Sequence, residues 1–457
     1  MGRFQIAVFL SGFCLLLAGC QPANQPALPD SLAGPDPETV TLTGIQAVRD
    51  LPDAIPGQPP GSDVWNTWRG PSGTGRASAQ NPPVEWDEQT GVVWKTPVPG
   101  RGHASPMIHR GRVYLPTAEA GQQQRSLCCF DEASGELLWE TVVHQDVATE
   151  EIHHQNSHAS SSAAITEDGV FVLFVVDEQL WLSKLDPDGK LIWQKDIGPF
   201  VSDHRYGFGT SPVVWQDRLF VAADSSDVGF LVALDPGDGH EIWRTDRPEG
   251  TSYSTPVVLN AAGKDQLLVS GRWTIKSYDP ATGKELWSAP ADWSTSCGTM
   301  VTDGDRVFAS GGFPAAATIA VKGDGSAEIA WKNGVRCYEQ SMLAHDGYLY
   351  ALADNGVAYC WRAADGQEMW KKRMQSRVSA SPVLADDRIY FTTQSGSTFV
   401  VRASPDRYEL LATNQLGDSV LATPAFVNNR IYTRIGMGQG GDRQEWLYCL
   451  GHQPAAD

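Results

Sequence analysis

The sequence predicts an all-β fold, an eight-bladed β-propeller with four antiparallel strands in each blade. One observation is a repeat of Asp, Gly and Trp with a period of about 40–50 residues, which is typical of propellers and other repeat folds. Its clear copies are Asp131, Gly135 and Trp139; Asp235, Gly239 and Trp243; and Asp279, Gly283 and Trp287. Two further observations are eight similar strand starts and an unpaired strand at each end of the repeat region.

Each unit reads as four strands. The first begins with Ser or Thr, usually followed by Pro, which is tolerated where a strand starts. The eight starts are Ser105, Ser162, Ser211, Thr255, Thr299, Ser341, Ser381 and Thr423. A second strand follows a Gly, Asp or Asn turn, and a third runs into the Asp of the repeat. The Gly makes a tight turn, and the fourth strand carries the Trp.

The ends of the repeat region predict how the ring closes. Residues 447–450 form a third strand with no fourth strand after them, and residues 90–94 form a fourth strand with no blade before them. Pairing the two would remove both exposed sheet edges. The seventh unit is degenerate, because Tyr408 and the residues after it stand where Gly and Trp are expected.

The residues before the ring predict export and tethering. Residues 4–17 form an apolar run after Arg3 that is too short to span a membrane stably, as in a signal peptide. Residues 17–20 resemble the lipobox of bacterial lipoproteins, in which Cys20 is lipidated; an ordinary cleavage site is the alternative. Gln21 after Cys20 favours the outer membrane in that resemblance. Residues 21–61 contain nine prolines and predict a disordered tether of roughly 35 Å. The domains expected are therefore a signal peptide (1–20), the tether (21–61), the propeller (62–452) and a tail (453–457).

Composition narrows the class of partner. The chain of 457 residues carries a net charge of −19 and has no cluster of Lys or Arg. This charge argues against nucleic acid and against an anionic membrane surface as electrostatic partners. Membrane attachment is expected through Cys20 alone, and the propeller is expected to be monomeric.

The repeat resembles that of the pyrroloquinoline quinone (PQQ)-type propellers over roughly residues 65–450. That superfamily includes quinoprotein alcohol dehydrogenases and the outer-membrane assembly lipoprotein BamB. The eight blades, the lipobox and the tether are similar to BamB, whereas residues 65–71 and 100–106 resemble BamB-like bacterial propellers without a known role. The resemblance implies a propeller fold, but it does not by itself specify an activity.

Two motifs resemble functional sites, but each has a structural interpretation. Cys128 and Cys129 could form the vicinal disulfide of some quinoproteins, but Cys129, Cys360 and Cys449 occupy one repeat-equivalent position, which favours core packing. The Gly-rich residues 436–441 match a dinucleotide fingerprint as a string. They lie between two strands with no helix after them, so we expect a hairpin loop.

Candidate binding residues fall into two groups. His144, His153, His154, His158 and His204 lie in the two longest connections, where loops on a rigid scaffold usually carry function. Three hypotheses are open for these connections: a protein-binding lip, a solvated loop or a metal site. The metal site has the least support, and no metal ligands are assigned. The residues before the first strands are expected to ring the mouth of the channel, where they could hold an anionic ligand: His103, His158, Tyr206, Tyr253, Glu339 and Arg377.

Three functions remain open. The first is a noncatalytic, lipid-anchored propeller that binds a protein or ligand in the bacterial envelope, similar to BamB, with the outer-membrane barrel assembly machinery as the implied partner. The second is a PQQ-dependent dehydrogenase, which needs Ca²⁺ and an Asp base; Glu339 and Asn156 do not make a complete set. The third is a ligand-binding sensor. The first reading expects no catalytic residue and no cofactor.

Overall fold

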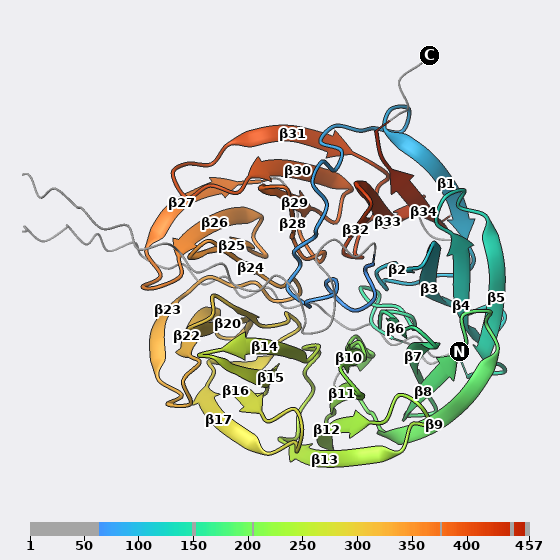
Figure 1. Cartoon of the computed structure of the whole chain (residues 1–457), viewed down its shortest axis with the longest axis horizontal. Coiled ribbons are helices and arrows are strands. Elements are labelled where there is room, and N and C mark those ends of the chain that lie inside the picture. Colours follow the sequence, from blue (N-terminus) through green and yellow to red (C-terminus); the bar gives the residue numbers. More distant parts are fainter. Residues whose placement is uncertain (1–63, 149–151, 203–204, 375–376, 439–442, 453–457) are drawn as a thin grey trace, which may run out of the picture. The chain divides into compact units, whose positions relative to one another are not determined.

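The computed structural model describes residues 64–148, 152–202, 205–374, 377–438 and 443–452. They form eight four-stranded antiparallel sheets arranged around a central axis, as predicted (Figure 1). The expected signal peptide, Cys20, tether and tail lie outside the described residues. Within the described ranges, we find no helix with the length and apolar character needed to cross a membrane.

The blades follow one another along the chain, each running from an inner to an outer strand (Figure 1). The first four blades comprise β2 (Met107–His109), β3 (Arg112–Glu119), β4 (Gln124–Asp131) and β5 (Leu137–His144); β6 (Ala164–Thr166), β7 (Gly169–Val176), β8 (Gln179–Leu185) and β9 (Leu191–Pro199); β10 (Val213–Trp215), β11 (Arg218–Asp224), β12 (Gly229–Leu234) and β13 (Glu241–Arg247); and β14 (Val257–Ala261), β15 (Lys264–Gly271), β16 (Thr274–Tyr278) and β17 (Glu285–Pro290).

The remaining blades comprise β19 (Val301–Thr302), β20 (Arg306–Gly311), β22 (Ala317–Lys322) and β23 (Ile329–Asn333); β24 (Leu343–His345), β25 (Tyr348–Leu352), β26 (Val357–Arg362) and β27 (Glu368–Arg373); β28 (Val383–Ala385), β29 (Arg388–Thr392), β30 (Ser397–Arg402) and β31 (Leu410–Gln415); and β32 (Ala425–Val427), β33 (Arg430–Met437), β34 (Gln444–Leu450) and β1 (Val92–Val98). A small two-stranded sheet of β18 (Trp293–Thr295) and β21 (Phe313–Pro314) accompanies blade 5.

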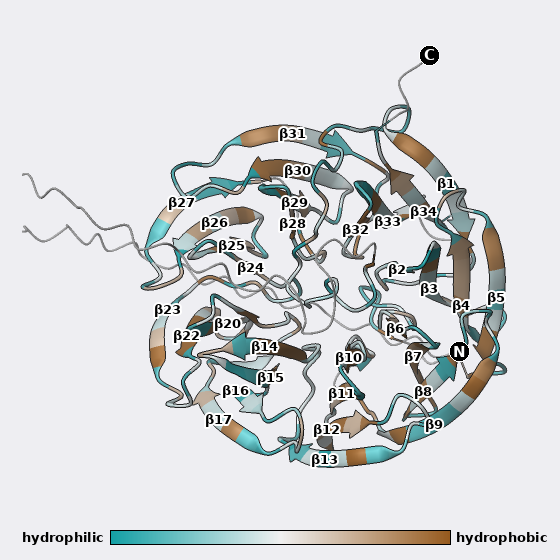
Figure 2. Cartoon of the chain, viewed as in Figure 1, coloured by the Kyte–Doolittle hydropathy of each residue, from teal (hydrophilic) through white to brown (hydrophobic). Residues whose placement is uncertain are grey.

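Burial differs between the strands of a blade. Every residue of β12 is buried, whereas β13 alternates between exposed and half-buried positions along most of its length. The outermost strands correspondingly show alternating hydrophobic and hydrophilic bands (Figure 2). The middle strands are covered on both faces by neighbouring blades, so the core lies between the blades.

The ring closes as predicted. The N-terminal strand β1 is the outer strand of blade 8 and pairs antiparallel with β34, with Thr96 opposite Leu447. The sheet order is β1-β34-β33-β32. Closure pairs the outer edge of β34, which would otherwise be free to attract another chain.

The Ser and Thr residues predicted to start the inner strands precede these strands by two residues and form a ring of their own. The N–H of Ser105 donates to Ser162 Oγ (2.9 Å), and that of Thr423 donates to Ser105 Oγ (3.0 Å), which joins the last blade to the first. The same bond links Ser162 to Ser211, Ser211 to Thr255, Thr299 to Ser341, Ser341 to Ser381 and Ser381 to Thr423. In these seven links the backbone N–H bonds to the next blade rather than to its own sheet, which is why the strands begin later than predicted.

The Asp–Gly–Trp repeat joins one blade to the next. The turn before β17 places Gly283 (φ +70°) against the indole of Trp243 from the preceding blade. Thr245 Oγ1 donates to the carbonyl of Gly283 (2.7 Å), and Trp243 Nε1 donates to that of Pro280 (3.2 Å). Equivalent contacts join Gly135 to Trp94, Gly189 to Trp139, Gly239 to Trp193 and Gly366 to Trp331. The repeat is therefore the interface between blades.

Blade 7, which lacks its own Trp, receives one from the segment before β1. Trp86 is 7% exposed and stacks on Tyr390 at 6.3 Å. Trp139 and Tyr114 make a similar contact within blade 1, at 6.0 Å. The backbone N–H of Trp86 donates to Asn414 Oδ1 (2.9 Å), which anchors the segment to β31.

The cysteines pack as the repeat predicts. Cys129 pairs in register with Trp139, Cys360 with Trp370 and Cys449 with Trp94, so the three thiols occupy equivalent places. All six Cys residues in the described part of the chain are free thiols. Burial raises the pKa of the Cys129 thiol to about 12, with a smaller contribution from Asp131, so it stays protonated. These properties fit small hydrophobic core residues.

Residues 65–77 run across the inner strands. Trp65 exchanges two backbone hydrogen bonds with Ile108 of blade 1, and Ala77 donates to Leu384 of blade 7 (2.8 Å). Asn66 contacts blade 2 through Ile165, Trp68 contacts Thr299 of blade 5, and Arg69 contacts Met342 of blade 6. Figure 1 shows this blue segment inside the ring of inner strands. Ile108, Ile165 and Leu384 each lie three residues after the Ser that starts the corresponding blade, Ser105, Ser162 or Ser381. The segment therefore covers one end of the channel, and the connections that precede the inner strands lie at the other end.

Candidate functional site at the channel mouth

The two long connections predicted to bind a partner form one lip. The backbone N–H of His153 donates to the carbonyl of Arg205 (2.8 Å), and Asn156 Nδ2 donates to the carbonyl of Tyr206. The ring of His153 lies 4.3 Å from that of His154 and 4.6 Å from that of Tyr206. Tyr206 is 42% exposed, so the lip presents an aromatic stack to solvent. His204 lies outside the described residues.

A cavity of about 300 Å³ lies behind this lip, against blades 1 and 2. His158 lines it, together with apolar side chains from both connections and from β7. The aromatic and charged side chains that line the cavity include Phe174, Phe200, Phe208, Arg125, Arg205 and Glu178. An apolar wall with a few charged groups is typical of a small-molecule or side-chain pocket.

His144 lies away from the aromatic stack. It ends β5 and packs edge-on against Phe174 (6.1 Å) and Trp181 (5.8 Å), between blades 1 and 2. Burial, with a smaller contribution from Arg125, lowers the pKa of His144 to about 4. Its surroundings are those of a packed, neutral imidazole.

A second part of the mouth gathers residues from blades 3 to 7. Tyr253 shares a hydrogen bond of 3.0 Å with Ser202, and Ser379 donates a hydrogen bond to the carboxyl group of Glu339. Burial raises the pKa of Glu339 above its usual range, with Asp354 adding to the rise, while Ser379 and Arg377 oppose it.

The sequence did not predict Tyr338, which connects these residues. Burial raises the pKa of Tyr338, and Cys297, Tyr253, Glu339 and Tyr206 contribute in the same direction. These groups are therefore near neighbours, and three of the predicted mouth residues, Tyr206, Tyr253 and Glu339, come together around one phenol. The position of Tyr338, directly before Glu339, was the signal available in the sequence.

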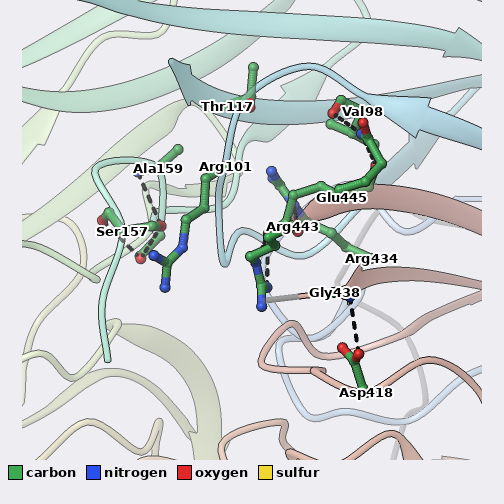
Figure 3. A network of polar contacts seen from close by, with 12 residues as sticks. Val98, Arg101, Thr117, Ser157, Ala159, Asp418, Arg434, Gly438, Arg443 and Glu445 are labelled. Atoms are coloured by element: carbon green, nitrogen blue, oxygen red, sulfur yellow. Dashed lines mark hydrogen bonds and ion pairs between the residues drawn. The ribbon is translucent and has the colours of Figure 1, made fainter. Parts of the chain in front are cut away.

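The third part of the mouth lies between blades 8 and 1 and is basic. Figure 3 shows Arg101, Arg434 on β33 and Arg443 directly before β34. His103 lies near these three arginines, on the same connection as Arg101. Burial lowers the pKa of His103 well below its usual value, and the three arginines add to this effect, so the imidazole is neutral at pH 7. The arginines were not predicted from the sequence. The feature that could have indicated them is Arg434, a charged residue among the buried positions of β33.

Three carboxylates at the mouth, Asp354, Glu445 and Glu339, do not fit a PQQ and Ca²⁺ site. Ca²⁺ takes six to eight oxygen ligands. Asp354 is paired with Arg336 (2.7 Å), Glu445 is paired with Arg434 and Arg443, and Glu339 is buried with a raised pKa. The amide of Asn156, a possible ligand in the sequence, holds the lip together instead. We therefore derive no reaction through a quinone.

One cluster in the described ranges has the composition of a metal site, but it lies elsewhere. Asp235, Asp238 and His240 are close together on the turn between β12 and β13. Asp235 accepts from the N–H of Gly237 (2.7 Å) and Asp238 from that of His240 (2.9 Å). These bonds explain the cluster as turn chemistry.

Comparison with known proteins identifies the family. A family model described as "Outer membrane protein assembly factor BamB" matches residues 76–180, 178–264 and 271–408, which is more than half of the chain. The chain belongs to this family. Among curated proteins, BamB of Yersinia pestis is 25% identical over 296 residues, covering 59% of this chain and 70% of that protein.

Dehydrogenases are also similar to this BamB-family chain. The 1-butanol dehydrogenase (quinone) of Thauera butanivorans is 27% identical over 229 residues, 46% of this chain. The match spans about a third (33%) of the length of that enzyme.

Solved structures show the same fold. A europium-containing methanol dehydrogenase has a TM-score of 0.64 at 13% identity, with 86% of this chain and 98% of that chain covered. BamB from Moraxella catarrhalis has a TM-score of 0.55 at 13% identity, with 80% and 99% covered. At these identities the likeness concerns the fold alone.

Proposed function

We propose that this protein is a noncatalytic, lipid-anchored propeller that binds a partner in the bacterial cell envelope. The observation that carries the proposal is the BamB-family match along residues 76–408, with no gap longer than the six residues between 264 and 271. By analogy with the name of the family, the partner is a component of outer-membrane protein assembly. Attachment through Cys20 to the periplasmic side of the outer membrane completes the proposal.

The lip supports a binding role. Its two connections hold each other through His153, Asn156 and Tyr206, so the aromatic stack is presented by a preformed structure. Exposed aromatic side chains on an ordered surface are typical of the centres of protein interfaces.

The proposal is tested in cells that carry a tagged full-length chain. After crosslinking, proteins that co-purify from membranes are identified, with Cys20→Ser as the variant that lacks the anchor and Tyr206→Ala as the variant with a disrupted lip. Barrel-assembly components that co-purify with the parent protein and are reduced in Y206A would support the proposal. Their consistent absence from the parent sample would refute it.

A quinone-dependent dehydrogenase is the second candidate, because the 1-butanol dehydrogenase is also a relative. A ligand-binding sensor shares the sequence features of the first candidate. Adding PQQ and Ca²⁺ to the purified protein, followed by a thermal melt and a dye-reduction assay with alcohols, separates the enzyme from both. A shift in Tm accompanied by alcohol-dependent dye reduction would establish the dehydrogenase.

A further inference from the structure

We propose that the basic part of the mouth, formed by Arg101, Arg434 and Arg443, binds an oxyanion, that is, a carboxylate or phosphate group. The proposal rests on the binding role proposed above and adds the chemistry of the ligand. This cluster is positively charged, although the whole chain has a net charge of −19.

The three guanidinium groups outnumber the carboxylates that pair with them. Arg434 Nε donates to Glu445 Oε2 (3.1 Å), and Arg443 Nη2 lies 2.9 Å from Glu445 Oε1. Asp418, the next carboxylate in Figure 3, accepts from the backbone N–H of Gly438 (3.0 Å). Among the described residues of this cluster, Glu445 is therefore the one carboxylate paired with a guanidinium group, and its partners are Arg434 and Arg443.

Two buried groups of the cluster have unused hydrogen-bonding capacity. Arg434 is 2% exposed, and its Nη1 donates to the carbonyl of Pro116 (2.8 Å). Its Nη2 is buried and has no hydrogen-bond partner within the described part of the chain; the same holds for Nε2 of His103. A buried cation with an unpaired donor is costly, and an anion nearby reduces the cost.

Two of the three arginines are accessible to solvent. The side chain of Arg443 is 18% exposed, and Arg101 is exposed. In Figure 3 the Arg101 side chain runs toward Ser157, whereas Arg434 and Arg443 lie on the other side of the Arg101 connection, near Glu445. A ligand from solvent would therefore contact Arg101 and Arg443, while Arg434 supplies charge from below.

The backbone is shaped for these side chains. A Cβ at Gly102 would lie 2.3 Å from Arg434 Nη1, and one at Gly436 would lie 2.1 Å from Arg443 Nη2. The two glycines let both guanidinium groups lie flat against the main chain. Planar guanidinium groups bind carboxylate and phosphate through paired N–H donors, which favours these ligands over a halide.

The basic cluster is linked to the lip. Arg101 Nη2 donates to the carbonyl of His154 (3.3 Å), whose ring packs against that of His153 at a tilt of 40°. An acidic group bound at the arginines would thus lie beside the aromatic stack. A ligand with an acidic group next to an apolar or aromatic part fits both features.

The test is isothermal titration calorimetry of the full-length protein with three probes: malonate, inorganic phosphate and a hexaglutamate peptide. We expect saturable binding that weakens as NaCl is raised. Arg443→Gln and Arg101→Gln should each weaken it by tenfold or more. Glu445→Gln should strengthen it by several-fold, because it removes the counter-charge, and a merely structural role would not produce that sign.

Arg402→Gln is the matched control. Arg402 is exposed and paired with Glu409 (3.1 Å) on blade 7, so R402Q changes the net charge equally without touching the mouth. Tighter binding of malonate or phosphate would indicate a free small molecule, and tighter binding of hexaglutamate an acidic protein segment; both support the site. Undetectable binding of all three probes, or an equal loss in R402Q, would overturn it. Because no partner protein is involved, neither result depends on the co-purification experiment.

Discussion

Gly283 and Trp243 lie against each other across the interface of two blades, and a Cβ at Gly283 would be 2.4 Å from Trp243 Cε3. The glycine is needed for two reasons at once, its positive φ and this close approach. The same pairing recurs around the ring, which makes it the unit of contact between blades.

Gly283→Ala is therefore expected to destabilise the fold by more than backbone strain alone. The matched control is Gly347→Ala, where φ is +77° and no atom lies within 4 Å of the added Cβ. The control should cost about 1–2 kcal/mol from the left-handed conformation, and G283A about 2 kcal/mol more from displacement of Trp243. Urea unfolding of both variants measures the difference; equal losses would contradict the role of the tryptophan contact.

Trp65→Ala should weaken the segment that crosses the inner strands. Trp65 is 1% exposed and packs near Phe426 (6.4 Å), so truncation should cost about 3–5 kcal/mol. Trp273→Ala is the control, because that side chain is 44% exposed, and it should change stability by about 0.5 kcal/mol or less. Thermal and urea unfolding report both values. If W65A were as stable as W273A, the segment would not be part of the core.

Glu339→Gln should change how stability depends on pH. The pKa of Glu339 is raised in the folded protein, so the folded state holds its proton to a higher pH than the unfolded state does. The folded protein therefore loses stability as pH rises from the ordinary carboxyl range through that raised pKa. E339Q should lack this loss and be at least as stable as the parent at pH 7. The exposed Glu328→Gln, on the turn before β23, is the comparison; an unchanged pH profile in E339Q would refute the expectation.

His144→Phe should reduce acid sensitivity. The folded-state pKa of His144 is lowered to about 4, so the unfolded chain binds the proton first, and stability falls as pH drops from about 6.5 toward 4. H144F removes this contribution, although His103, whose pKa is also lowered, leaves part of the slope. Unfolding free energies between pH 4 and 8, with the exposed His240→Gln as control, measure it. A slope identical to that of the parent would show that His144 does not titrate as described.

The sequence predicted the mouth in part. Tyr206, Tyr253, Glu339 and Arg377 lie before the inner strands of blades 3, 4, 6 and 7, and a ring places such residues on one face. Arg434 and Arg443 could not be found in this way, because they lie on later strands of blade 8 and meet Arg101 through contacts more than 300 residues apart in the chain. His144 was grouped with the lip by sequence proximity, but the end of β5 lies away from the aromatic stack, against Phe174 and Trp181.

The sequence by itself determined the number of blades, the closure of the ring by β1 and the place of each Asp–Gly–Trp turn. These are local features, because a turn needs its glycine and an unpaired strand needs a partner wherever they occur. The tertiary structure decided that Trp86 fills the place of the missing tryptophan in blade 7, that residues 65–77 cross the inner strands, and that Arg434 and Arg443 both pair with Glu445. Such contacts depend on how the closed ring brings distant segments together, and no periodicity in the chain records that geometry.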